Sequence, residues 1–344
     1  MNKTNVIISG AGISGLCAAI FLLSHGIDVS IYEESSSLRS EGGCIQIPES
    51  ILFYLDQLEL SYEFKKTALR CNNIKTQHKK MINRDIEQMI IFKGIKEYMQ
   101  EENIYTISRG DLYEILLKKL RSLKAKCIFL SSSVKEFKEL QSNINVLIND
   151  QIFMANYVLG ADGVRSNLRK QITFQNPSVK FINYGIWRSK IKVIDELYDA
   201  QADLYSDGAN WIYTIPYVQK SQVYIELLGI LKTKNFNTYV EKTGDVKQMI
   251  KDFEGFDSHV LSILNNINEK CYYYDMPLKT EPAILGTNRC ILLGDAAKSY
   301  PDFIGFGSAQ AIKQTIVTLS SIFHLPLKTN ISKVYTHRKP FCGV

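Results

Sequence analysis

The opening stretch of the chain, NVIISGAGISGLCAAIFLLSHGIDVSIYE (residues 5–33), restricts the fold more than any other segment does. Residues 6–8 are the apolar run of a buried strand, residues 16–24 follow with helical spacing, and residues 29–32 are a second strand candidate. A short glycine-rich loop joins the first strand to the helix. This order predicts a β-α-β unit and therefore an α/β fold.

The loop carries the GxGxxG spacing, and each of its glycines has a separate role. Gly10 permits the tight turn, Gly12 lets the backbone approach a pyrophosphate, and Gly15 lets the helix pack on the strand. Glu33 ends the second strand eighteen residues past Gly15, where a carboxylate can accept hydrogen bonds from ribose hydroxyls. The unit predicts dinucleotide binding, against the alternative of a glycine-rich turn in some other α/β fold. It leaves NAD and FAD both open.

The chain after this unit favours a flavin. An NAD domain would continue at once with a second mononucleotide half. Residues 65–103 are instead rich in Lys and Asn and show no clear alternation of helix and strand.

The bulk composition bounds the remaining possibilities. A length of 344 residues leaves room for two domains, or for one large domain with an inserted lobe. The net charge of +6 comes from scattered lysines, which indicates a solvated surface and predicts no nucleic-acid partner. Seven dispersed cysteines without a CxxC pair predict reduced thiols and a cytoplasmic location. The sequence has neither metal-site spacing nor a run of eighteen apolar residues for a membrane span.

Three later segments add candidate binding residues. Arg109 starts the amphipathic helix of YTISRGDLYEILLKKL, where an arginine is usually on the surface but can also bind a phosphate in two places. Asp162 lies in the turn GADG after a strand, where helix capping is the alternative role. The loop GDAAKSYPDFIGFG (294–307) joins a buried strand to a helix, whose N-terminal N–H groups suit an electron-rich ligand.

These motifs, in this order, resemble one family. The glycine loop, SRGDLYEILL, GADGVRSNLR and RCILLGDAAKSYPDFIGFG are similar to motifs of the FAD-dependent aromatic-hydroxylase-type (group A) monooxygenases. That family has the para-hydroxybenzoate hydroxylase fold and includes the tetracycline-inactivating monooxygenases. EGGCIQI and GIWRSKI resemble two further segments, so that the resemblance covers nearly the whole chain.

The resemblance implies a Rossmann-like FAD-binding domain with an inserted β-sheet substrate lobe. The domain would comprise residues 1–70, 101–170 and 281–344, and the lobe residues 71–100 and 171–280. Aromatic residues of the lobe could line a pocket or fill a core; they are Trp211, Tyr213 and Tyr224. The cofactor-binding residues that the family motifs imply are Gly10, Gly12, Gly15, Glu33, Arg39, Gln46, Arg109, Asp162, Asp295 and Gly307. The resemblance names no catalytic side chain and no metal ligand.

Several positions depart from the family pattern. Cys44 stands in place of a glycine and Lys298 in place of a histidine, while Phe306 and Ala309 replace a glutamine and an asparagine. We expect an FAD-dependent monooxygenase that uses NAD(P)H and O₂ to hydroxylate a small aromatic or polycyclic substrate. Two alternatives stay open: another flavin oxidoreductase on the same scaffold, or a non-catalytic or truncated FAD-binding protein with a partner chain. The end of the chain at Val344 favours the second alternative.

Overall fold

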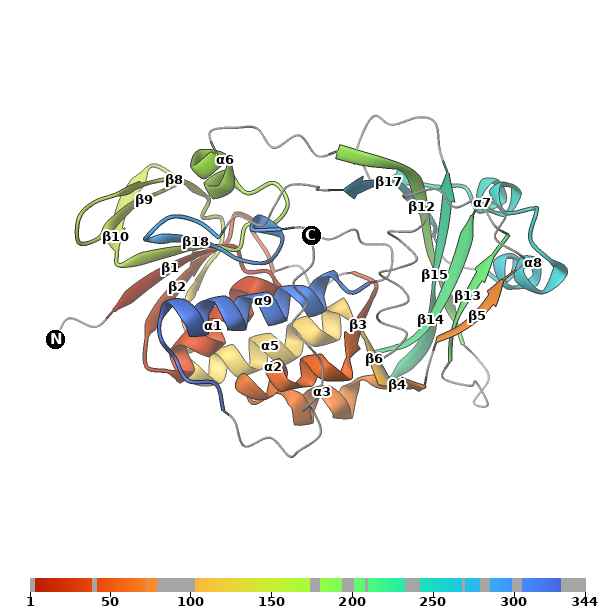
Figure 1. Ribbon diagram of the computed structural model, residues 1–344, viewed down its shortest axis with the longest axis horizontal. Helices are drawn as coiled ribbons and strands as arrows, with labels where there is room; N and C mark the ends of the chain where they lie inside the picture. Colours follow the sequence, from red (N-terminus) through yellow and green to blue (C-terminus); the bar gives the residue numbers. More distant parts are fainter. Residues whose placement is uncertain are drawn as a thin grey trace.

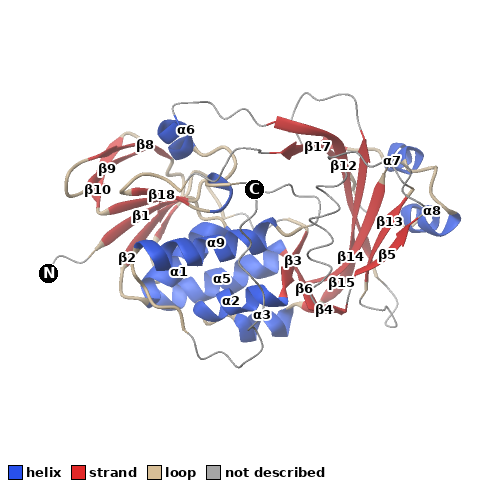
Figure 2. Ribbon diagram, in the orientation of Figure 1, coloured by secondary structure: helices blue, strands red, loops and turns tan. Residues whose placement is uncertain are grey.

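The computed structural model describes most of the chain, and its two main sheets lie at opposite ends of the molecule. Figures 1 and 2 show a parallel sheet with a layer of helices at one end of the molecule and a large twisted sheet at the other. The described residues are 4–38, 42–72, 74–78, 103–173, 180–193, 201–207, 210–232, 242–267, 270–278, 285–298 and 305–328.

The parallel sheet contains the unit predicted from residues 5–33. Its strand order is β18-β11-β1-β2-β7. The strands are β1 (Asn5–Ser9), β2 (Asp28–Tyr32), β7 (Ile128–Phe129), β11 (Tyr157–Gly160) and β18 (Cys290–Leu292). The inner strand β1 is apolar throughout its centre because both faces of a covered parallel sheet are buried.

Helices cover one face of this sheet. They are α1 (Ile13–Ser24), α5 (Arg109–Leu123) and α9 (Gly307–Ile322), which lie side by side in Figure 1. Residues 13–22 of α1 are all buried, because α1 lies between the sheet, α5 and α9. Shorter helices pack beneath them: η1 (Glu49–Ile51), α2 (Leu52–Gln57) and α3 (Ser61–Thr67). Among the described helices, none is long and apolar enough to cross a membrane.

A small antiparallel sheet packs against the parallel one, and its apolar side chains share a core with those of β1, β11 and β18. Its strands are β8 (Val134–Glu139), β9 (Ile144–Ile148) and β10 (Gln151–Ala155), in the order β10-β9-β8. The helix α6 (Asn167–Thr173) packs on β8.

The large sheet forms the other end of the molecule. Its main path is β16-β17-β12-β15-β14-β13-β5, and β14 also pairs with β6, which in turn pairs with β3 and β4. The strands are β3 (Cys44–Pro48), β4 (Leu69–Asn72), β5 (Ile74–His78), β6 (Asn103–Ser108), β12 (Lys180–Lys192), β13 (Ala202–Ser206), β14 (Trp211–Gln219), β15 (Gln222–Lys232), β16 (Lys242–Thr243) and β17 (Tyr272–Leu278).

The sequence predicted a hairpin from the segments that form β14 and β15, and the structure contains it. Gln219 pairs with Gln222, and the two residues between them have φ values of 48° and 64°. Positive φ at both positions is the signature of a type I′ turn, whose twist matches that of the strands.

The two faces of the large sheet are buried differently. One face packs on α7 (Val246–Asp252) and α8 (Ser258–Asn265), with Trp187 and Leu227 in the core between them. The opposite face carries a cluster rich in aromatic side chains. This cluster also includes Cys44 of β3 and Phe306, the residue before α9. The aromatic face is therefore turned toward the elements that build the site described below.

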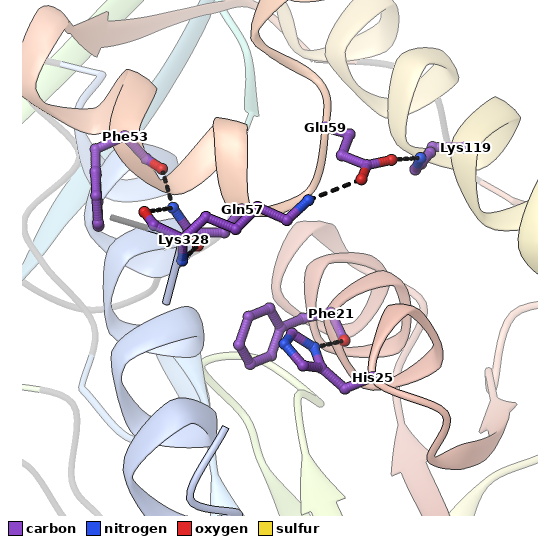
Figure 3. A network of polar contacts seen from close by, with 7 residues as sticks. All are labelled: Phe21, His25, Phe53, Gln57, Glu59, Lys119 and Lys328. Atoms are coloured by element: carbon purple, nitrogen blue, oxygen red, sulfur yellow. Dashed lines mark hydrogen bonds and ion pairs between the residues drawn. The ribbon is translucent and has the colours of Figure 1, made fainter. Parts of the chain in front are cut away.

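Side chains also tie the segment after α9 to the rest of the helical layer (Figure 3). The Gln57 side chain accepts a hydrogen bond from the backbone N–H of Lys328 at 2.8 Å and donates to the Lys328 carbonyl oxygen at 3.4 Å. The Lys328 ammonium lies 2.7 Å from Glu59, whose other oxygen lies 2.7 Å from Lys119 of α5. One carboxylate thus joins the α2–α3 turn to α5 and to the segment after α9.

Glu59→Gln is expected to destabilise the protein slightly, and only above acidic pH. Bonds from Lys119 and then Lys328 lower the pKa of Glu59 from 4.5 to about 2. A lowered carboxyl pKa stabilises the folded state above pH 4.5, and this contribution disappears as the pH falls through about 2. Because Glu59 is 58% exposed, solvent limits the effect to about 1 kcal/mol or less.

Urea unfolding of the wild type and of Glu59→Gln over this pH range measures the difference in their free energies of unfolding. Asp150→Asn is the matched control, since the carboxylate of Asp150 is 94% exposed in its pair with Lys135. A deficit in Glu59→Gln that persists unchanged at the lowest pH would contradict the assignment.

Candidate cofactor and substrate site

Three loops meet at the carboxyl edge of the parallel sheet because the strands before them are neighbours in register. Ser9 of β1 pairs with Gly160 of β11, and Gly160 pairs with Leu292 of β18. The loops that follow these strands start at residues 10, 161 and 293. Open parallel sheets bind ligands at this edge.

The glycines of the first loop differ in what surrounds them. Gly10 has a φ of 98°, and a Cβ there would lie 2.5 Å from the carbonyl oxygen of Ala161. A Cβ on Gly15 would lie 2.0 Å from the carbonyl oxygen of Gly10. No atom of the described residues lies within 4 Å of the Cβ position of Gly12. Gly10 and Gly15 are thus required for packing, whereas Gly12 leaves space open.

Two cavities lie along this edge and share part of their lining. The first chamber, of about 590 Å³, lies beside the end of β2 and includes Glu33. The second chamber, of about 350 Å³, lies between the glycine loop, β3 and the start of α9 and includes Asp295. The residues that line both are Gly12, Arg109, Ala161, Gly163 and Arg165. The site is therefore elongated, with a glycine backbone and two arginines at its middle.

Side chains hold the glycine loop from two directions. Glu33 accepts a hydrogen bond from the Ala11 N–H at 2.8 Å and another from the Ser35 N–H at 3.0 Å. Tyr113 of α5 donates from its hydroxyl to the Ala11 carbonyl oxygen at 2.8 Å. Burial, and then the Glu33 carboxylate, raise the pKa of Tyr113 to about 12, so that it remains a donor at neutral pH. We did not predict Tyr113 from the sequence, although it follows Arg109 by one helical turn.

Arg109 lies between the two chambers because α5 begins there. The side chain of Ser108 caps the helix by accepting from the N–H of Asp111 at 2.9 Å. The Arg109 N–H donates to the carbonyl oxygen of Gly43 at 2.9 Å. Gly42 has a φ of 148°, and a Cβ there would lie 2.7 Å from Cδ of Arg109. The arginine side chain therefore lies directly against the glycines that precede β3.

Asp162 and Arg169 shape the second and third loops. Asp162 accepts a hydrogen bond from the Asn167 N–H at 2.9 Å, and burial raises the pKa of this carboxyl. Arg169 is buried and donates to the carbonyl oxygens of Asp295 at 3.3 Å and Ala296 at 3.2 Å. The predicted capping role of Asp162 is present, and Arg169 joins the loop after β11 to the loop after β18.

Asp295 and Gly307 both line the second chamber. Asp295 lies in the short turn η2 (Gly294–Ala296) that follows β18. Gly307 is the first residue of α9, and the described chain places no atom within 4 Å of its Cβ position. Lys298 and Gln314 line a neighbouring hollow of about 50 Å³, which shares Asp295 and Gly307 with the second chamber.

Gln46 is placed differently from the other predicted residues. It is fully buried on β3, where its N–H donates to the Gly305 carbonyl oxygen at 3.1 Å and its Oε1 accepts from the Tyr213 hydroxyl at 2.9 Å. Gln46 is not one of the described residues that line the two chambers. Trp211 and Tyr213 are buried in the aromatic cluster, as the core alternative predicted. Arg39 lies outside the described residues.

The fold and the two chambers define a dinucleotide-binding α/β protein whose site reaches a second sheet. A family model described as "FAD binding domain" matches residues 3–330, and the chain belongs to this family. The predicted cofactor FAD and the predicted resemblance to FAD-dependent monooxygenases are confirmed.

The chain is also similar to curated relatives. It is 24% identical over 347 residues to the "Putative FAD-dependent monooxygenase YetM" of Bacillus subtilis (strain 168), and the match covers 98% of this chain and 89% of that one. It is 22% identical over 328 residues to 3-amino-4-hydroxybenzoate 2-monooxygenase PtmB3 of Streptomyces platensis, and this match covers 92% of this chain and 78% of that one. With zeaxanthin epoxidase of Prunus armeniaca the identity is 24% over 326 residues and the coverage 90% and 47%, so this chain spans about half of that relative.

Solved structures share the fold. CtdE in complex with FAD and a substrate superposes with a TM-score of 0.74 at 20% identity, over 93% of this chain and 81% of that one. A salicylate hydroxylase substrate complex superposes with a TM-score of 0.73 at 15% identity, over 94% of this chain and 80% of that one. The predicted fold class, a Rossmann-like FAD-binding fold with an additional β-sheet lobe, is confirmed.

Proposed function

We propose that the protein is an FAD-dependent monooxygenase that uses NAD(P)H and O₂ to hydroxylate a small aromatic or polycyclic substrate. The observation that carries this proposal is the pair of chambers that meet at Gly12 and Arg109 and continue to the large sheet at Arg188. The first part of this path has the lining that a dinucleotide needs. Its far end reaches the aromatic cluster at Cys44, where a substrate would bind.

The residues present fit FAD along this path. The open space at Gly12 admits a pyrophosphate, and Arg109 and Arg165 supply positive charge beside it. Glu33 in the first chamber suits the adenosine ribose, and Asp295 in the second suits the hydroxyls of the ribityl chain. Asp162 supports the turn that follows β11 by accepting from the N–H of Asn167. Arg39 and Gln46 stay predictions; the buried contacts of Gln46 favour a supporting role for its side chain.

The chain's own residues position and shield the chemistry that the cofactor brings. When bound, FAD supplies the redox step, in which NAD(P)H provides electrons and one oxygen atom of O₂ is added to the substrate. The N–H groups at the start of α9, beside Gly307, favour negative charge at the end of the second chamber. The aromatic cluster excludes water from the same end, which strengthens such interactions.

We also propose a cytoplasmic location. Six cysteines of the described chain are free and buried, as is usual in a reducing compartment. The proposed partner is a small molecule, because the site is a cavity of about 350 Å³ between the protein's own elements.

Absorption spectroscopy and turnover test the proposed function directly. The purified protein is expected to show a bound oxidised flavin, to oxidise NADH or NADPH, and to incorporate labelled oxygen from ¹⁸O₂ into a phenolic product. A protein that takes up no FAD contradicts the proposal. Oxidation of NAD(P)H without any oxygenated product, across a panel of phenols and polycyclic phenols, would favour the alternative of another flavin oxidoreductase.

Asp295→Ala is expected to weaken FAD binding while leaving ADP binding nearly unchanged. Asp295 lines the second chamber but not the first, so its proposed partner belongs to the flavin half of the cofactor. Loss of a hydrogen bond to a charged group costs about 1.5–3 kcal/mol, or roughly 10- to 100-fold in Kd. Fluorescence titration of the apoprotein with FAD and with ADP measures both. Equal losses for the two ligands would make Asp295 a purely structural residue.

A further inference from the structure

The peptide unit between Gly43 and Cys44 lies in the wall of the second chamber, and both of its polar groups are bonded. We propose that Glu226, a buried carboxylate of the large sheet, is a positioning residue that fixes the orientation of this peptide. The second chamber then accepts the flavin half of the cofactor only while the peptide keeps this orientation. This inference rests on the proposed function and adds a residue that acts on the cofactor from outside its chambers.

The two polar groups of the peptide have partners on different elements. The carbonyl oxygen of Gly43 accepts from the N–H of Arg109 at 2.9 Å, where α5 begins. The N–H of Cys44 donates to Oε2 of Glu226 at 3.3 Å. Because the C=O and N–H of a trans peptide lie in one plane and point in opposite directions, the two bonds together determine how this plane is turned.

The segment itself leaves the orientation of the peptide open. Gly42 and Gly43 precede β3, and Gly42 has a φ of 148°. Glycine adopts positive and negative φ about equally readily, so two glycines in a row let the next peptide turn at little cost. The pairing of β3 with β6 begins only at Cys44. The orientation therefore depends on the bonds from Arg109 and Glu226.

The carboxylate of Glu226 is itself held firmly beside this peptide. Its side chain is 4% exposed, and its Oε1 accepts from Nε of Arg188. A Cβ on Gly43 would clash with the same Oε1, so the carboxylate lies directly against this glycine. Hydrogen bonds from a backbone N–H to a carboxylate contribute more than those between neutral groups. Glu226 is thus placed to hold the Cys44 N–H in one direction.

The lining of the chambers shows which way this N–H is directed. The second chamber is lined by all four residues of the segment, Gly42, Gly43, Cys44 and Ile45. Glu226 is not one of the described residues that line either chamber. The Cys44 N–H therefore points to a group outside the chamber. Rotation of the peptide would direct one of its polar groups toward the chamber and change the space that a ligand can use.

A purely structural ion pair of Glu226 with Arg188, which joins β15 to β12, is the competing explanation. The apoprotein labelled with ¹⁵N-cysteine separates the two, because NMR then measures the amide hydrogen exchange of Cys44 directly. Two further cysteines in the same spectra report on general stability, Cys17 of α1 and Cys290 of β18. Fluorescence titrations with FAD and with ADP measure the consequence for the cofactor.

Glu226→Ala is expected to expose the Cys44 amide, which is protected in the wild type. Its exchange rate, relative to those of Cys17 and Cys290, should rise about 10- to 100-fold, as the loss of a hydrogen bond to a charged group implies. The Kd of FAD should rise by about 10-fold or more, because binding is weakened by the fraction of molecules that have lost the competent orientation. ADP binding should change little, since this peptide does not line the first chamber.

Two other variants serve as comparisons. Glu226→Gln keeps a carbonyl oxygen that can accept from the Cys44 N–H, so it should restore part of the protection and part of the FAD affinity. Tyr213→Phe is the matched control, because it removes a different buried hydrogen bond between the large sheet and β3, the one to Gln46. This variant should leave the relative exchange rate of Cys44 at the wild-type value.

Several results would overturn the inference. They are fast exchange of Cys44 in the wild type, an unchanged relative rate in Glu226→Ala, and an equal increase in Tyr213→Phe. Unchanged FAD affinity in Glu226→Ala, or equal losses for FAD and ADP, would overturn it as well and leave Glu226 a structural partner of Arg188. A wild type that takes up no FAD would instead contradict the proposed function, while the exchange of Cys44 in the apoprotein still tests the hold of Glu226 on the peptide.

Discussion

Gly12→Val is expected to produce a folded protein that no longer retains FAD. The backbone of Gly12 has a φ of −72°, which any residue adopts, and no described atom lies within 4 Å of its Cβ position. A valine side chain would therefore enter open space in the apoprotein without a clash. That space belongs to both chambers, at the position proposed for the pyrophosphate.

The expected loss of affinity is large because the new methyl groups would occupy the ligand's own volume. Overpacking in a filled site costs about 1–3 kcal/mol or more, so the Kd of FAD is expected to rise by roughly 5- to 150-fold or more. Circular dichroism and thermal unfolding of the apoprotein should match the wild type, while FAD titration should show little or no binding.

Gly15→Ala is the contrasting control from the same loop. Its Cβ would lie 2.0 Å from the Gly10 carbonyl oxygen, so this smaller substitution should already destabilise the apoprotein. If Gly12→Val retained FAD with wild-type affinity, the proposed path of the cofactor would be wrong.

Arg109→Ala is expected to weaken the binding of both FAD and ADP by about 1.5–3 kcal/mol, or roughly 10- to 100-fold. Arg109 lines both chambers, so its proposed partner is the pyrophosphate, which the two ligands share. Asp295→Ala, in contrast, should affect FAD alone. Arg109→Lys should recover part of the affinity, because it keeps the charge but not the two-point contact.

Parallel titrations of these variants with FAD and ADP give the measurement. An Arg109→Ala protein with unchanged affinities would place this side chain in a packing role against Gly42. Loss of FAD binding with intact ADP binding would move the proposed partner of Arg109 to the flavin half.

The sequence allowed the local parts of this site to be predicted, because their signals lie within one short segment. The glycine loop, Glu33 and the turn at Asp162 each follow a recognisable strand, and parallel strands bring their carboxyl ends to one edge. The same reasoning could assign Gly12 a different role from Gly15, although only the structure shows that Gly10 contacts Ala161.

Contacts between distant segments could not be predicted in this way. Tyr113 bonds to Ala11, and Glu226 bonds to both Arg188 and the N–H of Cys44. These residues lie far apart in the sequence, and the periodicity of the sequence does not indicate such contacts. The surroundings of Gln46 could not be predicted either. Its motif suggests a cofactor ligand, which stays a prediction, but the motif does not indicate that its side chain is buried against Tyr213 or that its N–H bonds to Gly305.

The strand β6 belongs to the large sheet, so ligand binding at the end of β6 affects the stability of this sheet. Ile107 of β6 pairs with Val218 of β14, and Arg109 directly follows Ser108, the last residue of β6. A ligand held at Arg109 therefore stabilises the native state of the large sheet through mass action, by about 2.7 kcal/mol at a hundredfold excess over Kd. Slower amide hydrogen exchange in β14 and β15 on addition of FAD would be the signature of this linkage, since no described residue of these strands lines either chamber.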